Sequence, residues 1–116
     1  MAGPNIIMYE CRSQMLIGKR RMEGNRYFTG EIRIGSAIYR YNDGWLESDG
    51  DKPSAEWPDG HWEYHRRSVL HRDPNEGPAI IDLTQGYTVD IMQGKAKKRT
   101  EIPTPKPSAP FRMVPA

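Results

Sequence analysis

Glycine and proline recur so often in this chain that long helices are strongly disfavoured. The 116 residues include 11 glycines and 10 prolines, and almost every stretch of about fifteen residues contains one or the other. Both residues disfavour a helix interior, and proline also lacks a backbone hydrogen-bond donor. Isoleucine outnumbers leucine, and three tryptophans and six tyrosines supply large side chains for burial. We therefore expect a mainly β protein.

Short alternating runs predict strands joined by glycine-containing turns. The runs 31–34 and 37–41 alternate between polar and apolar residues, and the second leads into Asn42-Asp43-Gly44, a strong hairpin signal. The segments 36–44 and 78–86 match in length, and 53–60 follows the same frame one residue shorter. The sequence therefore predicts a meander of short antiparallel hairpins built on a degenerate repeat.

The run His61 to His65 carries the most suggestive polar side chains. On a strand, Trp62 and Tyr64 share one face, and we expect the other face to present His61, Glu63 and His65 to solvent. The two histidines would then lie about 13 Å apart, too far to share one metal ion. We therefore expect no metal site.

Other signals of catalysis are also weak. Cys11 is the only cysteine and has no neighbouring base or activating group, so we expect an inert thiol rather than a nucleophile. No glycine-rich phosphate-binding motif occurs in the sequence. The sequence therefore predicts no enzyme, no catalytic residue and no cofactor.

A family resemblance covers about residues 58–95. It rests on His61-Trp62-Glu63-Tyr64, Leu70-His71-Arg72-Asp73 and Gly77-Pro78-Ala79-Ile80-Ile81, followed by Gly86-Tyr87-Thr88-Val89-Asp90 and Gly94-Lys95. These segments resemble the MORN-like β-hairpin repeats of bacterial and phage proteins. The chain departs from that pattern at Arg67-Ser68, where the repeat carries a glycine turn. The resemblance implies an elongated hairpin array used for binding.

Charge is distributed unevenly along the chain. Residues 94–116 hold six cations and one acid, whereas residues 43–63 hold seven acids and one cation. Such a separation suits head-to-tail self-association or an electrostatically matched partner.

Half of the prolines lie between residues 103 and 115. We expect a small β domain over residues 1–94 and an extended, basic, proline-rich arm over residues 95–116. Pro107 begins a PxxP spacing. The candidate partner-binding residues of the arm are Lys95, Lys97, Lys98, Arg99, Pro107, Phe111 and Met113. Those of the body are Trp45, Trp57, Trp62, Asp49 and Asp51.

These features predict a protein–protein interaction protein, such as a small phage-like or virion assembly component whose arm contacts neighbouring subunits. One alternative is an inhibitor that binds a larger, nucleic-acid-processing target through its acidic patch. A second alternative is a nucleic-acid-binding β module that uses its lysines and arginines. We expect a protein partner or a homo-oligomer. The sequence shows no signal peptide and no membrane-spanning apolar run, which predicts a location in the cytoplasm or in a large assembly.

Overall fold

The computed structural model describes residues 7–13 and 27–103. Within these residues the chain forms strands and no helix, which confirms the predicted mainly β fold. The strands are β1 (Gly30–Ile34), β2 (Ala37–Asn42), β3 (Trp45–Leu46), β4 (Ala55–Glu56), β5 (His61–Glu63), β6 (His65–Arg66), β7 (Val69–Leu70), β8 (Ile80–Asp82), β9 (Tyr87–Met92) and β10 (Lys95–Glu101).

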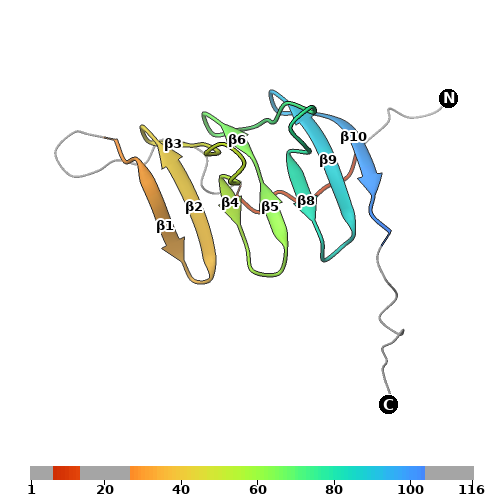
Figure 1. The fold of residues 1–116 in the computed structure, drawn as a ribbon, viewed down its shortest axis with the longest axis horizontal. Coiled ribbons are helices and arrows are strands. Elements are labelled where there is room, and N and C mark those ends of the chain that lie inside the picture. The colour runs from red at the N-terminus through yellow and green to blue at the C-terminus, as the bar shows by residue number, and fades with distance from the viewer. Residues whose placement is uncertain (1–6, 14–26, 104–116) are drawn as a thin grey trace, which may run out of the picture.

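Most of the strands lie side by side in one antiparallel layer (Figure 1). The order across this sheet is β1-β2-β4-β5-β8-β9-β10, with β3 pairing to β2, while β6 and β7 form a separate small hairpin. Neighbours in the sheet are mostly neighbours in sequence, because short turns connect antiparallel strands directly. The predicted meander of antiparallel hairpins is confirmed.

Three units of similar design make up the sheet. Each unit begins with a first strand, a turn at the lower end of the sheet in Figure 1 and a second strand. A turn at the upper end and a short or edge strand then complete the unit. The lower turns contain Gly35, Gly60 and Gly86, all with positive φ. The upper turns are Asp43-Gly44, Arg67-Ser68 and Gln93-Gly94, and both residues of each turn have positive φ. Positive φ at both central positions is the signature of the type I′ hairpin turn.

This architecture corrects the repeat frame expected from the sequence. Segment 36–44 contains the second strand and the upper turn of its unit, whereas segments 53–60 and 78–86 contain a first strand and a lower turn. The first segment is therefore out of phase with the other two by one strand. The error arose because Gly44 and Gly86 close different kinds of turn.

Each upper turn is hydrogen-bonded to the chain that precedes its unit. The amides of Gly44, Ser68 and Gly94 donate to the carbonyls of Phe28, Leu46 and Leu70, at 2.7, 2.8 and 2.8 Å. The same bond thus recurs at every junction and holds successive units in register.

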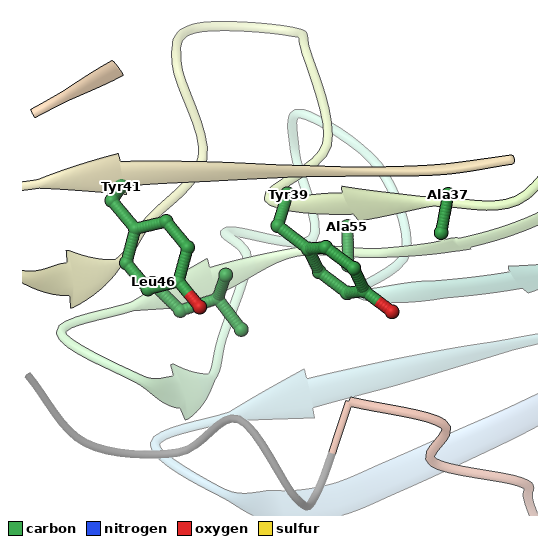
Figure 2. Close-up of a cluster of buried hydrophobic side chains, with 5 residues drawn as sticks. All are labelled: Ala37, Tyr39, Tyr41, Leu46 and Ala55. Carbon is green, nitrogen blue, oxygen red and sulfur yellow. The ribbon is translucent and has the colours of Figure 1, made fainter. Parts of the chain in front are cut away.

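The apolar core lies on one face of the sheet, which we call the inner face. One cluster consists of Ala37, Tyr39, Tyr41, Leu46 and Ala55 (Figure 2). A second cluster consists of Ala79, Ile80, Tyr87, Val89 and Ile91. Residues 7–13, called here segment 7–13, cross the inner face. The Met8 carbonyl accepts a hydrogen bond from the Arg99 guanidinium of β10. The Glu10 amide donates to the Tyr87 hydroxyl of β9, and the Arg12 amide donates to the Glu63 carboxylate of β5.

The sheet extends past the domain boundary that we predicted at residue 94. Lys95–Glu101 forms β10, which pairs with β9 through a register shift between Ala96 and Lys98. An edge strand tolerates this many charges because one side of it faces solvent. Arg99 also stacks its guanidinium 4.0 Å from the Tyr87 ring centroid. The predicted arm residues Pro107, Phe111 and Met113 lie outside the described residues. No helix in the described part is long and apolar enough to cross a membrane.

Candidate functional site

The inner face of the middle unit is polar where the other two units are apolar. The sheet register and the alternation along the chain place three inward residues of each unit at equivalent positions, the third residue of the middle unit lying at the start of β6. They are Ala37, Tyr39 and Tyr41 in the first unit, His61, Glu63 and His65 in the second, and Tyr87, Val89 and Ile91 in the third. The middle unit therefore places three ionisable groups inside the molecule.

His61 lies between two carboxylates, and all three side chains are fully buried. Its Nε2 is 2.7 Å from Oε2 of Glu63, and its Nδ1 is 3.1 Å from Oδ2 of Asp82 on β8. The Asp82 carboxylate also accepts bonds from the Thr84 hydroxyl and the Gln85 amide at 2.6 and 3.0 Å. This geometry suits a protonated imidazolium that donates to both carboxylates.

Segment 7–13 supplies the remaining partners of Glu63. The amides of Arg12 and Ser13 donate to the carboxylate at 2.7 and 3.3 Å, and the Ser13 hydroxyl donates to Oε1. Backbone amides are strong donors to a carboxylate in a dry environment. The Glu63 side chain therefore fastens segment 7–13 to the sheet.

His65 continues the network between two buried serines. Its Nε2 lies 3.1 Å from Ser13 Oγ, and its Nδ1 lies 2.6 Å from Ser54 Oγ. Since the Ser13 hydroxyl donates its only proton to Glu63, its oxygen must accept from Nε2–H of His65. We therefore place a proton on Nε2 of His65, while the single proton of the Ser54 hydroxyl has two neighbouring acceptors, the Glu63 carbonyl oxygen at 2.8 Å and Nδ1 of His65.

The pKa values of these groups follow from burial and hydrogen bonding. Burial alone would lower the pKa of His61, but the hydrogen bond and charge of Glu63 and the hydrogen bond of Asp82 outweigh it and raise the pKa. Burial would raise the pKa of Glu63, yet bonds from His61, Ser13 and Arg12 lower it. The pKa of Asp82 is lowered to about 2 in the same way, despite its burial. Burial lowers the pKa of His65 to about 4.

The expectation that His61, Glu63 and His65 face solvent was therefore wrong. Alternation along the strand does place them on a common side, but that side is the inner face. Their burial is compensated because each polar atom finds a partner from segment 7–13, β8 or Ser54. Among the described residues, no group of three or more histidine, cysteine or acidic side chains is arranged to hold a metal ion.

Cys11 lies at the edge of this network. Its Sγ is 3.8 Å from Oε1 of Glu63. Burial, followed by the negative charge of Glu63, raises the pKa of the thiol. Because the thiolate is disfavoured, the environment gives no support to a nucleophilic role.

The opposite face of the sheet, called here the outer face, carries a partly exposed apolar row. Ile38, Trp62 and Ile81 point outward from β2, β5 and β8, and Leu83 follows below them with 52% of its surface exposed. The register aligns Ile38 with Glu56, Glu56 with Trp62, and Trp62 with Ile81. Trp62, Ile81 and Leu83 thus lie next to one another, and Glu56 of β4 separates them from Ile38. Partly exposed apolar side chains grouped on a sheet face are a feature of binding surfaces.

A second surface feature is an aromatic groove at the lower end of β2 and β4. It is an open depression of about 380 Å³, lined by Arg12, Ile34, Ser36, Ala37, Tyr39, Trp57, Pro58 and Asp59. The rings of Tyr39 and Trp57 meet edge to face with centroids 5.7 Å apart. The Arg12 guanidinium lies 5.5 Å from the Trp57 ring and bonds to Asp59 at 2.9 Å.

The candidate binding residues of the body do not form one surface. Trp62 faces outward, whereas Trp57 lines the groove on the inner side, and Trp45 lies at the upper end in β3. Asp49 and Asp51 are exposed in the loop between β3 and β4. Lys95, Lys97, Lys98 and Arg99 lie on β10, at the far edge of the sheet. The sequence did not reveal the groove, because its lining residues Ile34 and Trp57 are far apart in the chain. Only the pairing of β1, β2 and β4 brings them to the same region.

Comparisons with protein-family models, with characterised proteins and with solved structures gave no match to this chain.

Proposed function

We propose that this chain is a non-enzymatic protein–protein interaction protein, a subunit that contacts neighbouring subunits of an assembly, in the simplest case other copies of itself. The observation that carries the proposal is the apolar row Ile38, Trp62, Ile81 and Leu83 on the outer face. Burying such side chains against a partner removes apolar surface from water, which is the main driving force of association.

The location of the chemically capable side chains supports a binding role. His61, Glu63, Asp82 and Ser13 have no exposed surface, and His65 is 2% exposed. A general acid or base must come within hydrogen-bond reach of its substrate. The hydrogen bonds of these groups are made to one another, to segment 7–13 and to Ser54, Thr84 and Gln85, which gives the network a structural use.

Charge placement supports contact between copies. The exposed Asp49 and Asp51 belong to the loop after the first unit, whereas Lys95, Lys97 and Lys98 belong to the edge strand β10 of the third. Opposite charges at separate places on one molecule can meet when two copies associate head to tail.

The test compares three full-length proteins by size-exclusion chromatography with light scattering. The unaltered chain should have a mass that is a multiple of 13.3 kDa. Leu83→Arg should move the mass toward that of a single chain, since it places a charge in the apolar row. Val69→Arg is the matched control, because Val69 is 45% exposed but lies off the row in β7. A single-chain mass for the unaltered protein, or equal masses for both variants, would contradict the proposal.

A further inference from the structure

Strand β1 forms one edge of the sheet, and within the described residues it pairs only with β2 (Figure 1). Arg40 of β2 lies opposite Glu31. The amide and the carbonyl of Arg40 bond to Ser54 and Glu47, on the side of β2 that faces away from β1. In an antiparallel ladder, the residue opposite such a position also turns its backbone groups away from the partner strand. The amides and carbonyls of Glu31 and of Arg33, two residues further along, therefore point to the open edge.

The sequence of this edge is complementary to itself. When a second copy presents its β1 antiparallel, with Ile32 opposite Ile32, each Glu31 lies opposite an Arg33 of the other copy. The backbone groups of these two residues are the ones on the open edge, so the pairing forms four backbone hydrogen bonds. The Glu31 and Arg33 side chains are exposed. Cross-strand pairs of opposite charge stabilise a sheet, whereas like charges destabilise it.

The surroundings of Glu31 favour a cation from a second copy. Glu31 is bonded to Arg40 at 2.8 Å, and its side chain remains 52% exposed. Together with Glu47 and Asp49, these two residues contribute the charged groups of an open depression of about 330 Å³ beside β1. Three acids against one cation leave this region negative. Arg33 makes no ion pair within the described residues, so it can supply the missing charge to the other copy.

The same register covers the exposed apolar side chain of β1. It places Gly30 opposite Ile34 of the second copy, and Ile34 is 47% exposed. A Cβ atom on Gly30 would lie 3.0 Å from the Phe28 ring, so this ring covers the glycine. Ile34 would therefore pack on Phe28 of the second copy, beside the contact between the two Ile32 side chains. Phe28 and Ile32 already pack on the first apolar cluster, and the pairing extends that cluster across both copies.

We propose that two copies of the chain join edge to edge through β1, related by a two-fold axis beside Ile32. The two sheets then form one antiparallel sheet with a common inner face and a common outer face. The other edge is unsuited to such pairing, because β10 carries four cations between residues 95 and 99. The proposal rests on the proposed function, since it names a second contact by which copies are joined. Leu83 follows β8, four strands along the sheet from β1.

The first experiment uses the full-length Leu83→Arg protein, in which the outer-face contact is disabled and the edge is intact. Short edge strands pair weakly by themselves, so amide hydrogen exchange is measured by nuclear magnetic resonance at increasing protein concentration. The amides of Glu31 and Arg33 should become protected as the concentration rises, because they are bonded only in the pair. The Ile32 amide faces β2 and should be protected at every concentration, which provides an internal control.

Two outcomes of this experiment would overturn the inference. One is that the Glu31 and Arg33 amides exchange freely at every concentration. The other is that their protection does not depend on concentration, which would show that the same chain covers its own edge.

The second experiment reverses the charges in the same Leu83→Arg background. Glu31→Arg places cations opposite Arg33, and Arg33→Glu places acids opposite Glu31, so each variant should pair with itself at least tenfold more weakly. Their equimolar mixture should form a one-to-one complex, because every cross-strand pair again joins a cation to an acid. Glu76→Arg is the matched control, since Glu76 is an exposed acid in the loop between β7 and β8, and it should leave pairing within twofold. Variants that pair as well as their background, or a mixture that remains single chains, would contradict the edge contact.

The edge contact and the proposed function fail in different ways. If the unaltered chain assembles and Leu83→Arg lowers its mass while the Glu31 and Arg33 amides stay unprotected, only the edge contact is wrong. If the unaltered chain and Leu83→Arg form the same two-chain species with those amides protected, the outer-face contact is wrong and the edge contact stands.

Discussion

Replacing Glu63 by alanine tests whether the buried network fastens segment 7–13 to the sheet. The carboxylate accepts bonds from His61, from the Ser13 hydroxyl and from the amides of Arg12 and Ser13. Removing it leaves a buried imidazolium with one carboxylate instead of two and two amides without their acceptor. Breaking a buried ion pair in this way costs about 3–5 kcal/mol of unfolding free energy.

The assay is urea unfolding followed by tryptophan fluorescence. With a slope of about 1.5 kcal/mol per molar urea, as is usual for a small domain, the midpoint should fall by roughly 2–3 M. Hydrogen exchange of the Arg12 and Ser13 amides should also accelerate relative to the amides of β9, because only the former lose their acceptor.

Glu31→Ala provides the matched control. Glu31 pairs with Arg40 at 2.8 Å, but its side chain is 52% exposed, so its removal should cost no more than about 1 kcal/mol. If Glu63→Ala lowers the midpoint no further than Glu31→Ala does, the network does not have the structural role assigned to it.

Three further predictions concern pH, turn geometry and segment 7–13. Because the pKa of His65 is lowered to about 4, the folded state binds fewer protons than the unfolded state between about pH 4 and 6.5, and the unfolding free energy should fall as the pH drops through that range. The raised pKa of His61 contributes stability that is complete below about pH 6.5 and is lost as the pH rises through the pKa that His61 has in the folded state. Urea midpoints should therefore be highest near pH 6.5. A flat pH profile would contradict these assignments. Arg67 has a φ of 49°, a conformation that asparagine tolerates better, so Arg67→Asn should stabilise the protein by roughly 0.5–1 kcal/mol, and a lower melting temperature would count against this. Tyr87→Phe removes the acceptor of the Glu10 amide, 2.8 Å away, and should cost about 1 kcal/mol and speed exchange of that amide; unchanged exchange would show that the bond is not formed in solution.

The turns could largely be predicted from the sequence. Asn42-Asp43-Gly44 contains a typical hairpin pair, and the structure places an upper turn there. Arg67-Ser68 lacks glycine, yet it forms the same kind of turn. The Ser68 hydroxyl accepts a bond from the Leu46 amide at 3.1 Å, and its own amide bonds to the Leu46 carbonyl. These contacts with the preceding unit compensate for an unfavourable backbone conformation.

The polar interior could not be predicted from local pattern. Alternation correctly grouped His61, Glu63 and His65 on one face, but hydropathy assigned that face to solvent. Their partners come from Ser13 and Asp82, which are distant in sequence from the strand. Only the tertiary structure shows that these groups satisfy one another, and satisfied polar groups can be buried without large cost.

The edge strand was missed for a related reason. The run Lys95–Glu101 was interpreted as the start of an extended arm because it is highly charged. Its alternation is weak, since Lys97 occupies the irregularity between the paired residues Ala96 and Lys98. Backbone pairing with β9 determines the strand, and side-chain hydropathy has little influence at an exposed edge.

The central claim is that this chain works by binding its neighbours through exposed surface. Light scattering of the unaltered full-length chain over a wide range of concentrations tests it most directly. The account predicts a mass above 13.3 kDa that rises with concentration and falls toward one chain in Leu83→Arg but not in Val69→Arg. A mass of one chain throughout, for the unaltered protein and both variants alike, would contradict it.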